Sequence, residues 1–261
     1  MIAWKLKLWR SAGAAALVGL SACGPSPAPV AEAPAPAGAS GEAAIGESGG
    51  EHGEAGVSLA YAGVEGDART GVRLQHLKGY LLIAERINEG DRPEDAGVLV
   101  SQGLLEVYDP AAAEFGALNA DKVRGAADGA GLTRAQMARK IHEATAAIDS
   151  ARAPLALNHA DLAARMVDLS TGLYQSVNQA DFVDPIEYQH SLGAALSARD
   201  ALVAGEAALR RENPAAYDEA IGEINRLIEL WPQATAPTTP TPYPDVLRQS
   251  SRVRLALSPF L

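Results

Sequence analysis

The 261-residue chain has a single cysteine and few aromatic residues, which make up 5% of the sequence. One cysteine cannot form a disulfide within the chain, so the stability of the fold must come from burial of apolar side chains. About half of the residues are hydrophobic, and alanine dominates them. An alanine-rich, aromatic-poor composition favours closely packed helices and disfavours a β-sandwich, which needs β-branched and aromatic residues.

Positive charge is also scarce, since 22 Lys and Arg residues face 32 Asp and Glu residues, for a net charge of −10. Residues 1–22 contain three positive residues, Lys5, Lys7 and Arg10, and no acidic one. Their removal would take the net charge from −10 to −13. Such an acidic surface repels phosphate backbones, so we expect no nucleic-acid partner. The same argument disfavours attraction to anionic membrane surfaces.

Known catalytic patterns are missing as well. The sequence contains no Gly-x-Ser-x-Gly elbow, no His-Glu-x-x-His zinc helix and no glycine-rich phosphate loop. Paired carboxylates are abundant, but an acidic chain contains them in any case. We therefore predict that the protein is not an enzyme and has no resident cofactor.

The N-terminus carries an export pattern. Three positive residues precede a short apolar run from Ala12 to Leu20, and Leu20-Ser21-Ala22-Cys23 follows. This tetrapeptide resembles the lipobox of bacterial lipoproteins, which implies cleavage after residue 22 and a diacylglycerol on Cys23. The apolar run is too short to cross a bilayer comfortably. Gly24 follows the cysteine in place of the Asp that often retains lipoproteins at the inner membrane. The resemblance thus implies a lipid anchor on the periplasmic face of the outer membrane, with the inner membrane as the alternative.

Three regions follow from composition and periodicity: a signal peptide at 1–22, a lipidated cysteine and disordered linker at 23–56, and a helical domain at 57–261. The linker is rich in Pro, Ala, Gly and Glu and cannot bury enough apolar surface to fold. Later segments repeat apolar residues at helical spacing. They predict an all-α antiparallel bundle of six or seven helices, at 71–88, 93–108 with a continuation at 110–118, 133–148, 158–177, 184–211, 213–231 and 246–257.

Four residues are candidate metal ligands. Glu187 and His190 stand three apart, so their side chains lie on one side of a helix, as in di-iron carboxylate bundles. The alternative is a capping Glu187 beside an ordinary histidine. His76 falls on the apolar arc of 71–88, where a hydrogen-bonded core histidine is the alternative. His159 follows the cap residue Asn158, and a role at the helix start is the alternative there.

Two stretches, 74–110 and 173–195, resemble uncharacterised exported helical proteins. These are related to the extracytoplasmic region of iron-permease proteins and to imelysin-like iron-uptake proteins. The resemblance covers about a third of the chain and implies an iron-related role. The chain departs from the resemblance near Tyr80 and at 98–103, where those relatives carry histidines and this chain has Tyr, Ser and Gln. The Arg-Glu-x-x-Glu motif of the permeases is also missing.

The sequence therefore supports two functional hypotheses. The first is a membrane-tethered periplasmic lipoprotein whose helical domain binds an envelope protein or a small ligand. The second is a metal-binding accessory protein of iron uptake that holds iron or zinc through Glu187, His190, His76 and His159.

Overall fold

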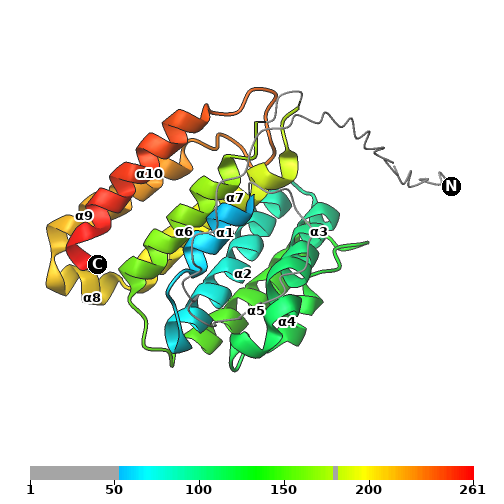
Figure 1. The fold of residues 1–261 in the computed structure, drawn as a ribbon. Helices are drawn as coiled ribbons and strands as arrows, with labels where there is room; N and C mark the ends of the chain where they lie inside the picture. The colour runs from blue at the N-terminus through cyan, green and yellow to red at the C-terminus, as the bar shows by residue number, and fades with distance from the viewer. Residues whose placement is uncertain (1–52, 179–181) are drawn as a thin grey trace, which may run out of the picture. The chain divides into compact units, whose positions relative to one another are not determined.

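The computed structural model describes residues 53–178 and 182–261, and the regular secondary structure of this part is helical, without strands. Its ten α-helices pack side by side (Figure 1). They are α1 (Gly53–Tyr61), α2 (Gly66–Glu89), α3 (Pro93–Gly103), α4 (Ala120–Gly125), α5 (Arg134–Arg152), α6 (His159–Tyr174), α7 (Pro185–Ala204), α8 (Glu206–Glu212), α9 (Pro214–Ile228) and α10 (Tyr243–Leu257). A π-helical segment, η1 (Leu104–Tyr108), and two 3₁₀ segments, η2 (Asp109–Phe115) and η3 (Ser258–Phe260), complete this part.

The predicted all-α bundle is confirmed. Seven of the described helices have at least eleven residues and correspond to the segments predicted from periodicity. The additional helices α1, α4 and α8 have nine residues or fewer. Chain segments of that length depend on packing against the rest of the domain, and this is why periodicity alone does not reveal them.

Helix starts follow the capping signals in the sequence. At α7, the Asp184 side chain accepts hydrogen bonds from the backbone N–H groups of Ile186 and Glu187, and Pro185 occupies the first helical position. At α5, Thr133 and Gln136 form the reciprocal capping box. These side chains satisfy backbone donors that have no partner within the helix, so they fix where each helix begins.

Two boundaries differ from the prediction. The helical domain was predicted to start at residue 57, whereas helix α1 begins four residues earlier, at Gly53. This helix packs Ala60 into the core. The single helix predicted at 184–211 is divided at Gly205 into α7 and α8. A Cβ atom on Gly205 would lie 2.5 Å from the Cβ of His159, so the start of α6 passes directly over this break.

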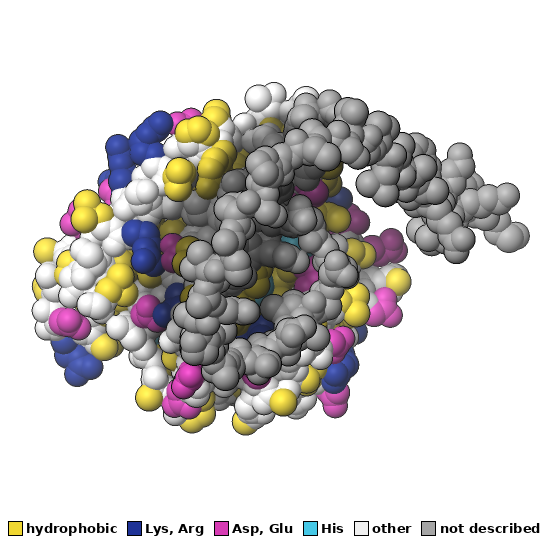
Figure 2. Space-filling model, viewed as in Figure 1, with side chains coloured by type: hydrophobic (Ala, Val, Ile, Leu, Met, Phe, Trp, Pro, Cys, Tyr) yellow, Lys and Arg dark blue, Asp and Glu magenta, His cyan; other side chains and the backbone are white. Residues whose placement is uncertain are grey.

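Helices α2 and α7 are the central elements of the bundle. Helix α7 packs against α6, α2 and α9, and α2 also packs against α3 and α5. Helix α10 covers α9 and α6, and α1 lies against α6. Helix α2 lies against the side of α7 that carries Gly193. On the face shown in Figure 2, acidic, basic and hydrophobic side chains are interspersed over the described surface.

The closest approach of α2 and α7 is made by two glycines. A Cβ atom on Gly193 would lie 2.7 Å from the carbonyl oxygen of Gly79, and one on Gly79 would lie 3.0 Å from the carbonyl oxygen of Gly193. Real Cβ atoms do not approach backbone oxygens this closely, so the crossing requires glycine at position 193 and strongly favours it at position 79. The two backbones therefore meet at a fixed register, which determines which α2 and α7 side chains face each other.

An ionic cluster with two buried cations adds a second link between α2, α5 and α7. The Lys78 ammonium lies 2.7 Å from Asp149 Oδ1 and 2.7 Å from Asp200 Oδ1. Arg152 contacts the same two carboxylates at 2.9 and 3.2 Å. Gln75 accepts a hydrogen bond from Arg152 and donates one to Asp200. Two positive and two negative charges thus balance one another beside the core.

The predicted signal peptide 1–22, the lipidation residue Cys23 and the linker up to residue 52 lie outside the described residues. Within the described part, no helix combines the length and the apolar character needed to cross a membrane.

Candidate functional site

A narrow, tightly packed crevice without room for a water molecule lies between α2 and α7, at their glycine crossing. Two of the four predicted ligands, His76 from α2 and His190 from α7, line it together with Tyr80. Since His76 and Tyr80 are one helical turn apart, they share a face of α2. His190 is three residues before Gly193, so the crossing that brings the glycines together also places His190 against Tyr80. The rings of Tyr80 and His190 are 4.7 Å apart between centroids.

Tyr80 connects His190 to a carboxylate that the sequence prediction missed. The Tyr80 hydroxyl donates a hydrogen bond of 2.7 Å to Glu106 Oε2 and lies 3.5 Å from His190 Nδ1. His190 Nδ1 is 3.8 Å from the same Glu106 oxygen. On the other side of the ring, His190 Nε2 lies 3.3 Å from Gln102 Oε1. Tyr80, His190 and Glu106 thus form one compact polar group, with Gln102 behind the imidazole.

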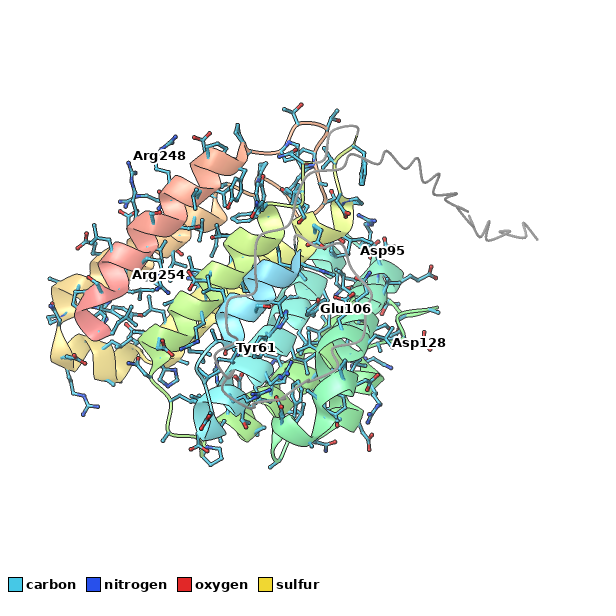
Figure 3. The ribbon with its side chains drawn as sticks, in the orientation of Figure 1. Tyr61, Asp95, Glu106, Asp128, Arg248 and Arg254 are labelled. Carbon is cyan, nitrogen blue, oxygen red and sulfur yellow. The ribbon has the colours of Figure 1, made fainter. Side chains whose placement is uncertain are left out.

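The π-helical segment η1 positions Glu106. It follows α3 directly at Gly103, where a Cβ atom would lie 2.7 Å from the Tyr80 ring. The wider π turn changes the direction of the side chains that follow it, and such turns occur frequently at functional sites. A regular helix was predicted to residue 108, so the register of Glu106 relative to Tyr80 could not be anticipated. Figure 3 labels Glu106 and Tyr61, which approach α2 from η1 and from α1.

His76 lies in the crevice but is engaged elsewhere. Its Nδ1 atom is 2.9 Å from the hydroxyl of Tyr61, and the guanidinium of Arg73 lies over the Tyr61 ring at 4.4 Å. Burial, followed by the charges of His190 and Arg73, lowers the pKa of His76 to about 3. Burial also lowers the pKa of His190, although Glu106 and Asp184 oppose the effect. Both imidazoles are therefore neutral at neutral pH, which is the state that binds metal ions.

Glu187 adds a second carboxylate to this region. Burial raises the pKa of Glu187 to about 7, and the negative charges of Asp184 and Glu106 add to the effect. Its Oε2 atom is buried and has no hydrogen-bond partner among the described residues. The capping alternative for Glu187 is wrong, because the backbone N–H of Asp184 donates to the carbonyl of Val177 and is not free for the Glu187 side chain.

His159 does not join the other predicted ligands. It is the first residue of α6, after Asn158, whose side chain accepts hydrogen bonds from two backbone N–H groups as predicted. Its ring packs against Gly205 at the junction of α7 and α8, and burial together with the charge of Arg152 lowers its pKa. The predicted set of four is thus divided: His76 and His190 line the crevice, Glu187 lies on the same side of α7 as His190, and His159 belongs to a helix junction.

The described residues contain no group of three or more His, Cys, Asp or Glu side chains arranged to hold a metal ion. The group around His190 has two members of those types, and its third member is a tyrosine. The sequence contains a signal for it, since Tyr80 falls one turn after His76 on the same helix. Comparison of the chain with models of protein families, with curated proteins and with solved structures finds no match.

Proposed function

We propose that the protein is a membrane-tethered lipoprotein of the periplasm whose helical domain binds a small cationic ligand, without catalysing a reaction. The observation that carries the proposal is the convergence of His190, Tyr80 and Glu106 at the crevice between α2 and α7. The tether rests on the lipobox-like sequence that ends at Cys23. Export without disulfides is consistent with a domain that contains an extensive buried core.

In the polar group at the crevice, more lone pairs face one another than there are hydrogens to bridge them. The single Tyr80 proton is donated to Glu106. In the tautomer whose Nε2 hydrogen points to the amide oxygen of Gln102, Nδ1 presents a lone pair to the Tyr80 and Glu106 oxygens. Lone pairs that face one another repel, whereas a cation among them would be attracted to all three. This argument favours a positively charged ligand over a neutral or anionic one.

Titration of the full-length chain in detergent with a panel of cations tests the ligand hypothesis. The panel holds alkali, alkaline-earth, transition-metal and small organic cations, and calorimetry gives the stoichiometry. We expect one class to bind at one equivalent and His190→Ala to abolish the binding. His142→Ala is the matched control, since His142 is an exposed histidine on α5. Binding of no cation, or equal loss in both variants, would contradict the proposal. A stable complex with an envelope protein in that case would support the other form of a binding domain.

The tether has its own test. We expect the wild-type chain to fractionate with the outer membrane and to incorporate labelled fatty acid, because Cys23 would carry the diacylglycerol. Cys23→Ser should lose the label. Gly24→Asp should keep the label and move the protein to the inner membrane. Labelling that persists in Cys23→Ser would refute the lipoprotein assignment.

A metal-binding accessory role in iron uptake is the second candidate function. It is favoured by the neutral state of both crevice imidazoles and by the buried Glu187 Oε2 atom, which has no hydrogen-bond partner among the described residues. Iron or zinc would then be the cationic ligand. The two candidates share one site and differ in how selective it is, so the same cation panel separates them.

A further inference from the structure

We infer that the outer face of α10 is a docking surface for the anionic phospholipid headgroups of the membrane that holds the protein. The inference concerns a different part of the molecule from the crevice between α2 and α7. It rests on the proposed function only in that the lipid anchor would bring this membrane within reach. The outer face of α10 comprises the exposed residues Leu247, Arg248, Ser251, Arg252, Arg254 and Leu255.

These six residues form one continuous arc around the helix. At about 100° per residue they span about 160°, and the two leucines lie between arginines on both sides. Leu255 is 73% exposed and Leu247 is 46% exposed. The opposite side of α10 carries the buried Val246, Val253 and Leu257, and the helix packs against α9 and α6. The arc therefore faces solvent although it carries large apolar side chains.

The charge of the outer face is opposite to that of the whole chain. It has three arginines and no acidic residue, whereas the chain has a net charge of −10. Arg248 pairs with Asp245 at 2.8 Å, and Arg254 pairs with Asp168 at 2.9 Å. Arg252 has no ion pair among the described residues. A guanidinium has five N–H donors, so an arginine that holds one carboxylate can also bind a phosphate.

Figure 3 labels Arg248 and Arg254 on α10, and basic side chains lie over the same helix in Figure 2. Three acidic residues on α10 or against it could repel a headgroup, but each already pairs with an arginine. The pairs are Asp245 with Arg248, Asp168 with Arg254 and Glu223 with Arg226. The local field at the outer face is therefore positive.

A phospholipid surface is the partner that fits this combination of side chains. A helix that lies in a membrane interface places its apolar side chains at the acyl boundary and its basic side chains among the headgroups. The planar guanidinium matches the geometry of phosphate oxygens. Two leucines and three arginines give only weak binding by themselves. A lipid anchor would hold the face at a high effective concentration near the membrane, so a weak surface suffices to orient the domain.

The negative net charge of the chain does not prevent this contact. At physiological ionic strength, exposed charges more than about 8 Å apart are largely screened from each other. Headgroups in contact with α10 therefore respond to its arginines and not to the acidic residues of distant helices. The expectation that anionic membrane surfaces are disfavoured follows from the average charge, and the outer face of α10 departs from that average.

The test places an environment-sensitive fluorophore in the middle of the outer face. Cys23→Ser with Ser251→Cys leaves a single thiol in the full-length chain, at position 251. The labelled chain is mixed with vesicles of phosphatidylcholine alone or of phosphatidylcholine with phosphatidylglycerol. We expect a blue shift of the emission only with phosphatidylglycerol. Ala138→Cys in place of Ser251→Cys is the matched control, because Ala138 is exposed on α5, and no shift is expected there.

Removal of the arginines tests the contribution of charge. Each basic residue near an anionic surface strengthens binding by about fivefold, so three together should contribute about a hundredfold. We expect the shift at position 251 to need about a hundredfold more lipid in the combined variant Arg248→Gln, Arg252→Gln and Arg254→Gln. The control variant removes the same charge from three exposed arginines of other helices, through Arg86→Gln, Arg139→Gln and Arg211→Gln. Residues 1–22 are present in every variant, so their effect is common to all.

The outcomes separate the docking surface from its alternatives. A shift with phosphatidylglycerol that is weakened in the α10 variant and kept in the control variant supports the inference. No shift at position 251, an equal shift with phosphatidylcholine alone, or equal weakening in both variants would overturn it. A shift caused by polyglutamate but not by vesicles would overturn it in favour of an acidic protein partner. These chains lack Cys23 and are probed without cations, so failure here leaves the proposed function standing, and failure of the proposed function leaves this result standing.

Discussion

The crossing of α2 and α7 makes a sharp prediction about stability. Gly193→Ala would place a Cβ atom 2.7 Å from the Gly79 carbonyl oxygen and 3.2 Å from the Ile83 Cγ2 atom. The oxygen belongs to the backbone of the facing helix and cannot rotate away, in contrast to the end of a flexible side chain. The two central helices must therefore separate locally, and the contacts on both sides of the crossing loosen.

Two opposing effects determine how much Gly193→Ala changes the free energy of unfolding. Overpacking of a well-packed core costs about 1–3 kcal/mol. Replacement of glycine by alanine in a helix interior contributes about 1 kcal/mol of stability. Gly222 in α9 provides a control for the second effect, because a Cβ atom there would meet nothing within 4 Å. The helix-propensity gain is common to both variants, so their difference isolates the steric cost. We expect Gly193→Ala to be less stable than Gly222→Ala by about 1–3 kcal/mol.

Urea unfolding of the full-length chain without added metal, followed by far-UV circular dichroism, measures this difference. We expect the midpoint to rise slightly in Gly222→Ala and to be clearly lower in Gly193→Ala, with similar slopes for both. A changed midpoint at constant slope reports a change in stability and not in the compactness of the unfolded state. If Gly193→Ala proves as stable as Gly222→Ala, the steric argument for the α2–α7 crossing is refuted.

Three further predictions concern the charges and caps of the bundle. Lys78→Ala should destabilise the fold by about 2–4 kcal/mol, because it removes a buried partner of two carboxylates. Lys122→Ala, in an exposed ion pair, should cost under about 1 kcal/mol. Urea unfolding measures both losses, and equal losses would contradict the prediction. Burial alone would raise the pKa of Asp200, but Lys78, Gln75 and Arg152 outweigh it and hold the pKa below its usual 3.8. The stability that ionised Asp200 contributes is therefore present above pH 3.8 and is lost as the pH falls below it. Asp200→Asn should make the free energy of unfolding less dependent on pH in this acid range, and an unchanged dependence would contradict the prediction. Asn158→Ala should cost about 1–2 kcal/mol in thermal or urea unfolding, since Asn158 caps α6 and also donates to the carbonyl of Phe260, and a neutral effect would argue against both contacts.

The sequence predicts the fold class and the starts of the long helices because these depend on local signals. At the start of α7, an Asp side chain accepts hydrogen bonds from backbone N–H groups two and three residues later, and a Pro occupies the first helical position. The division at Gly205 depends instead on a neighbour, since the backbone there is approached by His159 from α6. No pattern within 184–211 contains that information. The same reason explains why short α4 escapes detection.

The candidate site was only half predictable. Spacing on one helix places His76 with Tyr80, whose rings are 5.8 Å apart between centroids, and it places Glu187 on the side of α7 that carries His190. The convergence of the pairs depends on the register of two helices 110 residues apart, which the glycine crossing sets. Glu106 depends in addition on a π turn that no periodicity indicates. Long-range register and local helix irregularity are tertiary effects. Periodicity within one helix therefore predicts which residues share a face of that helix, but not which residues of different helices come together.

The glycine crossing links the stability of the fold to the proposed cation-binding group. Glycine in a helix interior costs about 1 kcal/mol relative to alanine, yet both central helices carry it where they meet. The close approach brings the Tyr80 hydroxyl within 3.5 Å of His190 Nδ1, which a wider crossing would not allow. Gly193→Ala should therefore lower both stability and cation affinity, whereas Tyr80→Phe should lower cation affinity with little loss of stability. If cation affinity survived in Gly193→Ala while stability fell, the polar group would have to be held by something other than this crossing. The three-atom site around His190 would then lose its geometric basis.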